Sequence, residues 1–279
     1  MCVIWGIPYL MIRVAVRELA PVTLVFLRTG LAAALLVPLA ARRGELRPLL
    51  ARWRPLLVYT GVEVALPWLL LSRAETTLTS SLTGLLIAAV PLVGASIVTL
   101  GGRWERLGGR RWLGLLVGIV GVAAIVGLDL GHVSLLGVGE VALVAVCYAV
   151  GPLIVARKMS GLPTLGVVAA SLALTALVYA PPAADRWPSS APSGRAIASV
   201  VGLAVVCSAA AFLIFFALIA EVGPLRASVI TYVNPAIAAV LGVTLLDERL
   251  TAGMVIGFAL VLAGSILATG GRPEAVAEP

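Results

Sequence analysis

Two ionisable residues, Arg28 and Glu63, stand inside long apolar runs of the sequence. A charged side chain at the centre of a membrane-spanning helix costs about 2.5 to 3.5 kcal/mol even on permissive scales, so such residues are candidates for function. At 1.5 Å per residue, Arg28 lies about 10 Å into its run and Glu63 about 12 Å into the next, counted from opposite ends. The two side chains therefore approach the same depth from opposite sides.

Functional and structural interpretations are both open for this pair. Burial disfavours the charged form of Glu63, so its carboxyl group could carry a coupling proton or meet a substrate amine. Arg28 is a candidate for the substrate cavity. Alternatively, Arg28 and Glu63 form a structural ion pair, or Arg28 extends its guanidinium to the membrane surface.

Polar and aromatic side chains outline the rest of a candidate cavity. Hydroxyl and amide side chains cluster on two predicted helices, and aromatic side chains are found on others. The polar candidates are Thr76, Ser80 and Thr83 on one predicted helix and Ser228, Thr231, Tyr232 and Asn234 on another. The aromatic candidates are Trp5, Tyr9, Trp68 and Tyr148. Hydroxyls often bond only their own helix carbonyls, and aromatic residues also form belts at membrane interfaces, so structural roles remain open.

The composition identifies the elements that must hold these residues. Of 279 residues, 61% are hydrophobic and only 12% are charged, and mean hydropathy is +1.11. Soluble domains have roughly 45 to 50% apolar and about 25% charged residues. This chain is therefore expected to be an all-α polytopic membrane protein. The net charge of +7 is better explained by arginines in short loops than by nucleic acid binding.

Ten apolar runs predict ten transmembrane helices. Their ends coincide with charged clusters or with Pro and Gly turns. The runs lie near residues 2–17, 21–41, 55–72, 77–101, 111–128, 135–156, 163–181, 195–220, 223–246 and 251–270. The first is short for a membrane core of about 30 Å, which leaves open whether Met1 is the true start.

The distribution of basic residues predicts the orientation. Loops on one side, together with a short tail at 271–279, hold about twice as many Lys and Arg residues as loops on the other side. Basic loops are retained in the cytoplasm. Both termini are therefore expected to be cytoplasmic, in a multi-pass protein of the cell membrane.

An internal repeat relates the two halves of the chain. Glu105 to Gly121 (ERLGGRRWLGLLVGIVG) matches Glu248 to Gly264 (ERLTAGMVIGFALVLAG). The prolines pair at the same spacing, Pro8 with Pro152 and Pro91 with Pro235. Residues 1–128 and 135–270 therefore form two five-helix units. Because five is odd, the second unit must be inverted in the membrane, which is the plan of many secondary transporters.

The repeated residues have mainly architectural interpretations. Small residues at helical spacing let helix backbones pack closely, either within one chain or between two protomers; the glycines concerned are Gly114, Gly118, Gly121, Gly253, Gly257 and Gly264. The paired prolines interrupt helices and are candidate hinges. Glu105 and Glu248 complement the dipoles of the helices that follow them, or form a gate by pairing with basic groups. Glu140 is likewise expected to stabilise a helix dipole.

Several stretches resemble a known family. Trp5-Gly6, PVTLVFLRTGLA at 21–32 and above all GPLRASVITYVNPAIAAVLGVTLLDERLTAGMVIGFALVLAG at 223–264 resemble the drug/metabolite transporter superfamily, EamA type. The resemblance covers nearly the whole chain. It implies a ten-helix, inverted-repeat carrier, often an exporter of amino acids or related metabolites. The short first helix and Glu63 depart from the family pattern, and Glu63 bears on substrate or coupling.

Other classes of membrane protein fit the sequence less well. An enzyme would need convergent catalytic groups, but the chain has one histidine and few acidic residues inside its runs. A channel filter and a nucleotide-binding loop are both missing from the sequence. No metal site or cofactor is predicted, because the three cysteines stand apart in apolar runs. The expected activity is secondary transport of a small molecule, with an amphipathic cation as the alternative substrate, with proton or exchange coupling, in a monomer or homodimer.

Overall fold

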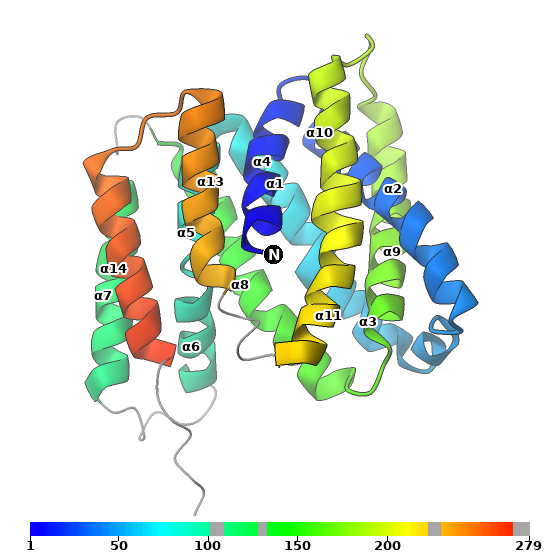
Figure 1. The fold of residues 1–279 in the computed structure, drawn as a ribbon, viewed down its shortest axis with the longest axis horizontal. Coiled ribbons are helices and arrows are strands. Elements are labelled where there is room, and N and C mark those ends of the chain that lie inside the picture. Colours follow the sequence, from blue (N-terminus) through cyan, green and yellow to red (C-terminus); the bar gives the residue numbers. More distant parts are fainter. Residues whose placement is uncertain (101–108, 128–132, 223–229, 270–279) are drawn as a thin grey trace, which may run out of the picture.

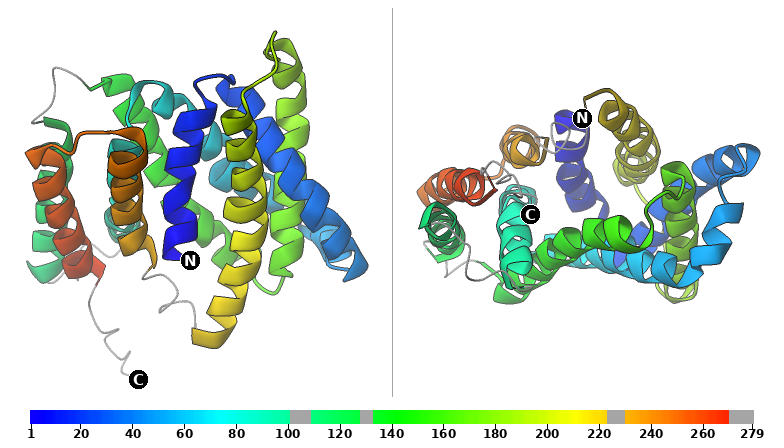
Figure 2. Two further views of the ribbon diagram at one scale, coloured as in Figure 1. Left: turned by 45° about the horizontal axis from the view of Figure 1, so that its top comes forward. Right: turned by 90° about the horizontal axis from the view of Figure 1, so that it is seen from below.

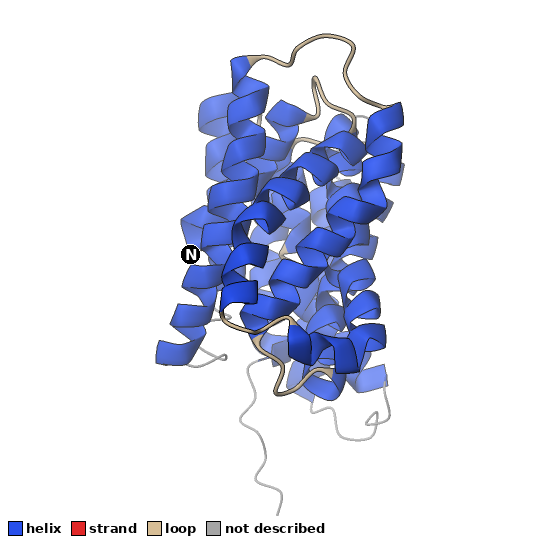
Figure 3. Ribbon diagram, turned by 90° about the vertical axis from the view of Figure 1, so that its right-hand side faces the viewer, coloured by secondary structure: helices blue, strands red, loops and turns tan. Residues whose placement is uncertain are grey.

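A computed structural model describes residues 1–100, 109–127, 133–222 and 230–269. Every regular element within these ranges is a helix (Figure 3). Among the described residues, eight helical segments are long and apolar enough to cross a membrane, and two shorter apolar helices, Cys2–Ala15 and Ile230–Leu246, accompany them. The chain is an integral membrane protein, as its composition predicts.

The helices follow one another through short connections. In the first half they are α1 (Cys2–Ala15), α2 (Pro21–Arg42), the 3-10 helix η1 (Arg47–Arg52), α3 (Trp53–Tyr59), the π-helix η2 (Thr60–Ala65), α4 (Leu66–Thr77), α5 (Ser80–Ile87), α6 (Val90–Leu100) and α7 (Gly109–Gly127). In the second half they are α8 (Leu135–Lys158), α9 (Thr164–Asp185), α10 (Gly194–Ala204), the π-helix η4 (Val205–Ala210), α11 (Ala211–Val222), α13 (Ile230–Leu246) and α14 (Ala252–Thr269).

Helices from the two halves pack against each other throughout the molecule. In Figure 1, α7 and α14 lie side by side at one edge, and α2 and α9 lie together at the opposite edge. The views of Figure 2 place α1 and α13 next to each other between these pairs. The two halves are therefore interleaved.

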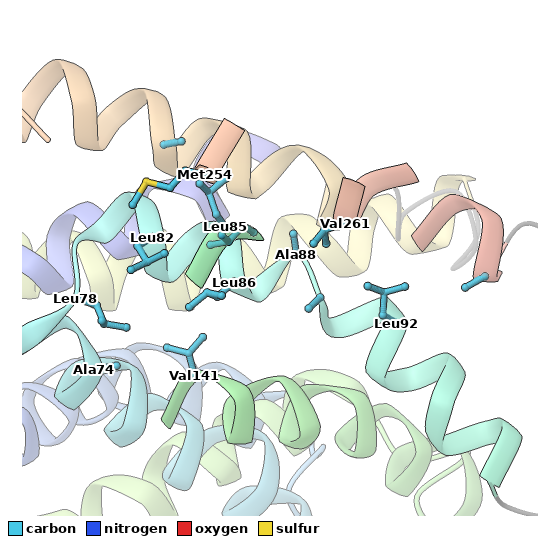
Figure 4. Packing of buried hydrophobic residues seen from close by; sticks show 14 of the residues in the cluster. Ala74, Leu78, Leu82, Leu85, Leu86, Ala88, Leu92, Val141, Met254 and Val261 are labelled. Atoms are coloured by element: carbon cyan, nitrogen blue, oxygen red, sulfur yellow. The ribbon is translucent and has the colours of Figure 1, made fainter. Parts of the chain in front are cut away.

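The largest apolar core joins α5, α6, α8 and α14. Leu82 and Leu86 of α5 pack with Val141 of α8 and Val261 of α14 in this cluster (Figure 4). By contrast, Leu116 and Ile119 of α7 are 58% and 63% exposed. Aliphatic side chains directed outward in this way suit contact with lipid.

In the described part of the chain, three glutamates in connecting segments bind the N-terminal ends of helices that are distant in sequence. Ser193 donates to Glu18 through its main-chain N–H and its hydroxyl, both at 2.6 Å, at the start of α10. These hydrogen bonds lower the pKa of Glu18. The Gly166 N–H, at the start of α9, donates to Glu45 at 3.1 Å. The carboxylate of Glu248 accepts hydrogen bonds from N–H groups at the start of α5, as described below. Unpaired N–H groups and the helix dipole both favour a carboxylate at these ends.

Candidate functional site

A central cavity of about 330 Å³ lies among helices from both halves of the chain. Its volume is at the lower end of the range of about 300 to 1,000 Å³ that is usual for small-molecule sites. The described residues that line it are Trp5, Pro8, Tyr9, Ile12, Arg28, Glu63, Val64, Trp68, Leu71, Ile87, Val90, Tyr148, Pro152, Cys207, Phe212, Phe215, Thr231, Asn234 and Pro235.

Arg28 of α2 is held in the cavity wall by two contacts. Its Nε donates to the Ser208 hydroxyl at 3.0 Å, and its guanidinium carbon lies 3.7 Å from the centre of the Trp68 ring. Stacking of a desolvated cation on an aromatic ring contributes about 2 kcal/mol. Arg28 is only 7% exposed, so it does not extend to the membrane surface. Its position is fixed, while guanidinium N–H groups beyond Nε provide further donors.

Glu63 enters the cavity from the π-helix η2. Its Oε2 is buried and has no hydrogen-bond partner among the described residues. A methyl group at Gly151 of α8 would collide with this oxygen, so the missing side chain of Gly151 makes room for the carboxylate. Among the described residues no ion pair joins Glu63 to Arg28, so the alternative in which the two form a structural pair does not apply. The carboxylate is therefore positioned to accept a hydrogen bond from a ligand.

The two π-helices begin 145 positions apart, at Thr60 and Val205. Each is held by a helix from the other half of the chain. Arg28 of α2 donates to Ser208 in η4, and Tyr179 of α9 donates to the carbonyl of Ala65 in η2 at 3.0 Å. Single π-helical turns are rare and frequently occur at functional sites. Here each one carries cavity residues.

Aromatic rings form much of the cavity wall. Trp5 of α1 lies 4.7 Å from Phe215 and 6.1 Å from Phe212 of α11, measured between ring centres. Tyr9, Trp68 and Tyr148 line other parts of the wall. The site is thus largely apolar with one fixed cation and one carboxylate.

The structure brings most of the predicted cavity residues together. Trp5, Tyr9, Arg28, Glu63, Tyr148, Thr231 and Asn234 line the cavity, with the prolines Pro8, Pro152 and Pro235. In the orientation that satisfies its neighbours, the Asn234 amide nitrogen donates to Cys2 O at 3.1 Å and Ile230 O at 2.8 Å. This amide thereby ties α13 to α1 at the Pro235 position.

Four predicted polar residues lie elsewhere. Thr76 and Thr83 bond main-chain oxygens of their own helical regions, at Arg73 and Thr79. Tyr232 and Thr269 share a hydrogen bond of 3.1 Å between α13 and α14. Thr76 and Thr83 also do not share a helix face, because the chain leaves α4 at Leu78, where ψ is 155°. Ser80 is fully buried and is engaged by Glu248.

Glu248 caps a helix other than the one that follows it. Its Oε1 accepts the Ser80 N–H at 2.8 Å, and its Oε2 accepts the Ser81 N–H at 2.8 Å and the Ser81 hydroxyl at 2.6 Å. In the described part of the chain, Glu248 has no basic partner. The predicted dipole role therefore applies to α5 and not to α14. Glu105 and Ser228 lie outside the described residues.

Among the remaining charged and kinked positions, Glu140 differs from expectation. Glu140 forms an ion pair with Arg73 at 2.9 Å between Nε and Oε1, so a side chain and not a helix dipole is its partner. Pro91 is the second residue of α6, directly after the break at residues 88–89 that separates α6 from α5. Pro8, Pro152 and Pro235 lie within their helices.

The glycine stripes lie in one intrachain contact between α7 and α14. A Cβ at Gly121 would be 2.7 Å from the Gly257 oxygen, and one at Gly264 would be 2.6 Å from the Gly114 oxygen. A Cβ at Gly118 would meet the side chain of Leu92 instead, and Gly253 is buried on α14. The backbones of the two helices approach closely where these residues have no side chain.

Sequence reasoning missed Glu75, Ser208, Phe212 and Phe215. Glu75 is completely buried in α4, but it falls in a predicted loop between the runs 55–72 and 77–101. Arg73 and Glu75 together resembled a polar helix end. Ser208 gives no sign in the sequence that it binds Arg28, which is 180 positions away.

Comparisons with known proteins agree with this architecture. The EamA-like transporter family matches the chain twice, over residues 1–127 and 135–270. Eleven chains of solved structures are similar. One, titled "Crystal structure of protein", aligns over 96% of this chain and 93% of its own, with 22% identity and a TM-score of 0.66, and supports the fold alone. Among curated proteins, none matches the sequence significantly. The chain therefore belongs to the EamA-like transporter family and is a membrane transporter.

Proposed function

We propose that the protein is a secondary active carrier that exports small amino acids or related zwitterionic metabolites. The observation that carries this proposal is the central cavity, which combines a buried guanidinium, a carboxylate without a protein partner and aromatic walls. A free amino acid has complementary charges. Its carboxylate would accept hydrogen bonds from Arg28, and its ammonium group would donate to Glu63.

The aromatic walls and the volume favour a small, apolar side chain. Trp5, Phe212 and Phe215 present rings to the space that the polar groups leave. A volume of about 330 Å³ suits a single compact solute. An amphipathic cation is the second candidate, because Glu63 and the aromatic rings could bind it without Arg28.

Alternating access would open this cavity first to the cytoplasm and then to the other side. The repeated family match, the paired prolines and the two π-helices at equivalent spacing support two inverted five-helix units. In this arrangement both termini lie in the cytoplasm, and the units rock about the cavity. Helices α1 and α13, which are both short and both contain a cavity-lining proline, would move most.

Reconstitution in liposomes tests the proposal. Labelled amino acids, purines and amphipathic cations would be screened for saturable uptake and counterflow, with and without a pH gradient. We expect counterflow of an apolar amino acid, with affinity reduced in Glu63→Gln and unchanged in Glu221→Gln, a matched change on an exposed residue of α11. Flux that never saturates, or a preference for cations that lack a carboxylate, would contradict the amino acid assignment.

A further inference from the structure

Glu75 is a buried carboxyl group that the central cavity does not use. It lies two residues before the end of α4, is 0% exposed and is not among the described residues that line the cavity. Neither of its carboxyl oxygens has a hydrogen-bond partner in the described part of the protein. A carboxyl group in this position needs a ligand of its own.

The charged groups around Glu75 direct their hydrogen bonds and ring contacts to atoms other than its carboxyl oxygens. Arg13 of α1 donates to the main-chain carbonyl of Glu75. Arg28 of α2 is engaged by Ser208 and Trp68. Glu248, which also acts on Glu75 electrostatically, is held by Ser80 and Ser81 at the start of α5.

The remaining titratable groups nearby belong to α1 and α8. Tyr9 of α1 interacts electrostatically with Glu75 and also lines the cavity. On α8, which packs along α4, Glu140 is paired with Arg73 and Tyr148 faces the cavity. Helix α5 presents only hydroxyl groups near its start. No group in this set neutralises the Glu75 carboxylate by direct contact.

An ionised carboxylate that is buried without a partner costs several kcal/mol, and the cost rises beside another carboxylate such as Glu248. Proton binding removes that charge. We propose that Glu75 is a proton-binding site separate from the substrate cavity, and that its proton permits Glu248 to close the adjacent end of the molecule.

The hydrogen bonds of Glu248 supply the closure next to Glu75. Glu248 joins the segment before α14 to the first turn of α5 through its bonds to Ser80 and Ser81. Loss of the proton would place a second negative charge beside Glu248 and would attract Arg13 from the carbonyl to the carboxylate of Glu75. Both changes weaken the closed arrangement. This coupling step rests on the proposed carrier function, whereas proton binding at Glu75 does not.

Infrared difference spectroscopy of the purified, full-length protein tests proton binding without any substrate. Spectra recorded at neutral and alkaline pH would resolve the carbonyl stretch of a protonated carboxylic acid. Because Glu63 is also a buried carboxyl group with an unpartnered oxygen, we expect a Glu75 component of this band in the wild type, which Glu75→Gln removes and Glu63→Gln, the matched change in the cavity, keeps. If Glu75→Gln does not fold, Glu75→Leu removes the same group without a buried amide. A band of wild-type intensity in either folded Glu75 variant would overturn the proposal.

Transport of labelled leucine separates this inference from the proposed function. With proton coupling through Glu75, Glu75→Gln should keep leucine counterflow but lose the stimulation by a pH gradient. Stimulation equal to that of the wild type would refute the coupling step. If the wild type fails to transport leucine while the Glu75 infrared band is present, the substrate assignment fails and the proton site stands.

Discussion

Replacing Gly151 by alanine should disable the substrate site without altering any of its polar groups. The new methyl group would occupy the place of the Glu63 Oε2, so the carboxylate must rotate away from its position in the cavity. The carboxyl end of Glu63 has to move, and its Cβ, which would lie 3.2 Å from the new methyl group, has to give slightly. A side chain displaced by about 30° from a preferred rotamer costs about 0.5 to 1.5 kcal/mol, so the fold should survive.

The effect on binding should be much larger than the effect on stability. A hydrogen bond to a charged group contributes about 1.5 to 3 kcal/mol. If the substrate ammonium group loses Glu63, we expect Kd to rise roughly 10- to 150-fold, because 1.4 kcal/mol corresponds to a factor of about ten. Binding of labelled leucine to the purified protein measures Kd, and thermal unfolding in detergent measures stability.

Gly139→Ala is the matched control, because Gly139 lies on the same helix and a Cβ there would meet nothing within 4 Å. Equal leucine affinity in Gly151→Ala and Gly139→Ala would refute the role assigned to Glu63. The double variant Glu63→Gln, Gly151→Ala adds a second check. If the methyl group acts through Glu63, it should have little further effect once the carboxylate is absent.

Three further predictions concern packing, the cation and pH. Gly121→Ala should destabilise the fold by about 1 to 3 kcal/mol, because the new Cβ would lie 2.7 Å from backbone atoms of α14. Gly127→Ala is the control, because a Cβ there would be in open space on the same helix. Thermal unfolding in detergent should show a large loss of stability for the first variant and little change for the second. Arg28→Lys keeps a charge but loses the planar Nε donor, so leucine Kd from direct binding should rise about tenfold, a loss of about 1.5 kcal/mol. Because Ser193 lowers the pKa of Glu18, their contact stabilises the fold at neutral pH and the stabilisation falls as pH drops below about 4.3. Glu18→Gln should therefore flatten the acid side of a plot of unfolding temperature against pH, and an unchanged slope would contradict this.

The sequence predicted the apolar runs and the main cavity residues for one physical reason. A charge or a proline inside an apolar run is costly, so Arg28, Glu63, Pro8, Pro152 and Pro235 were visible as exceptions. All five line the cavity. Positions that violate the simple pattern of a membrane helix therefore carried most of the information about the site.

Residues that obey local rules could not be assigned in this way. The hydroxyl of a helical threonine can bond a carbonyl one turn earlier or face a cavity. Thr76 and Thr83 bond the carbonyls of Arg73 and Thr79. The partner of Glu248 is 168 positions away in sequence at Ser80, and local spacing contains no signal for it. Glu75 was missed because Arg73 made the end of α4 resemble a loop, although Arg73 is satisfied by Glu140.

The two charged side chains of the cavity differ in the protein partners that they have before a ligand binds. Arg28 is already held by Ser208 in η4 and by the Trp68 ring, so a bound carboxylate adds to an existing arrangement. The Glu63 Oε2 has no partner among the described residues, so a donor from the substrate removes an unfavourable state. Arg28 and Glu63 both belong to the first half of the chain, and each touches the second half, Arg28 through Ser208 in η4 and Glu63 beside Gly151 in α8. A zwitterion bound by both would therefore bridge α2 and η2 at two points where the halves meet. A substrate that lacks either charge would reach only one of these two points, so under the proposed carrier function recognition of both charges would be linked to movement of one half against the other.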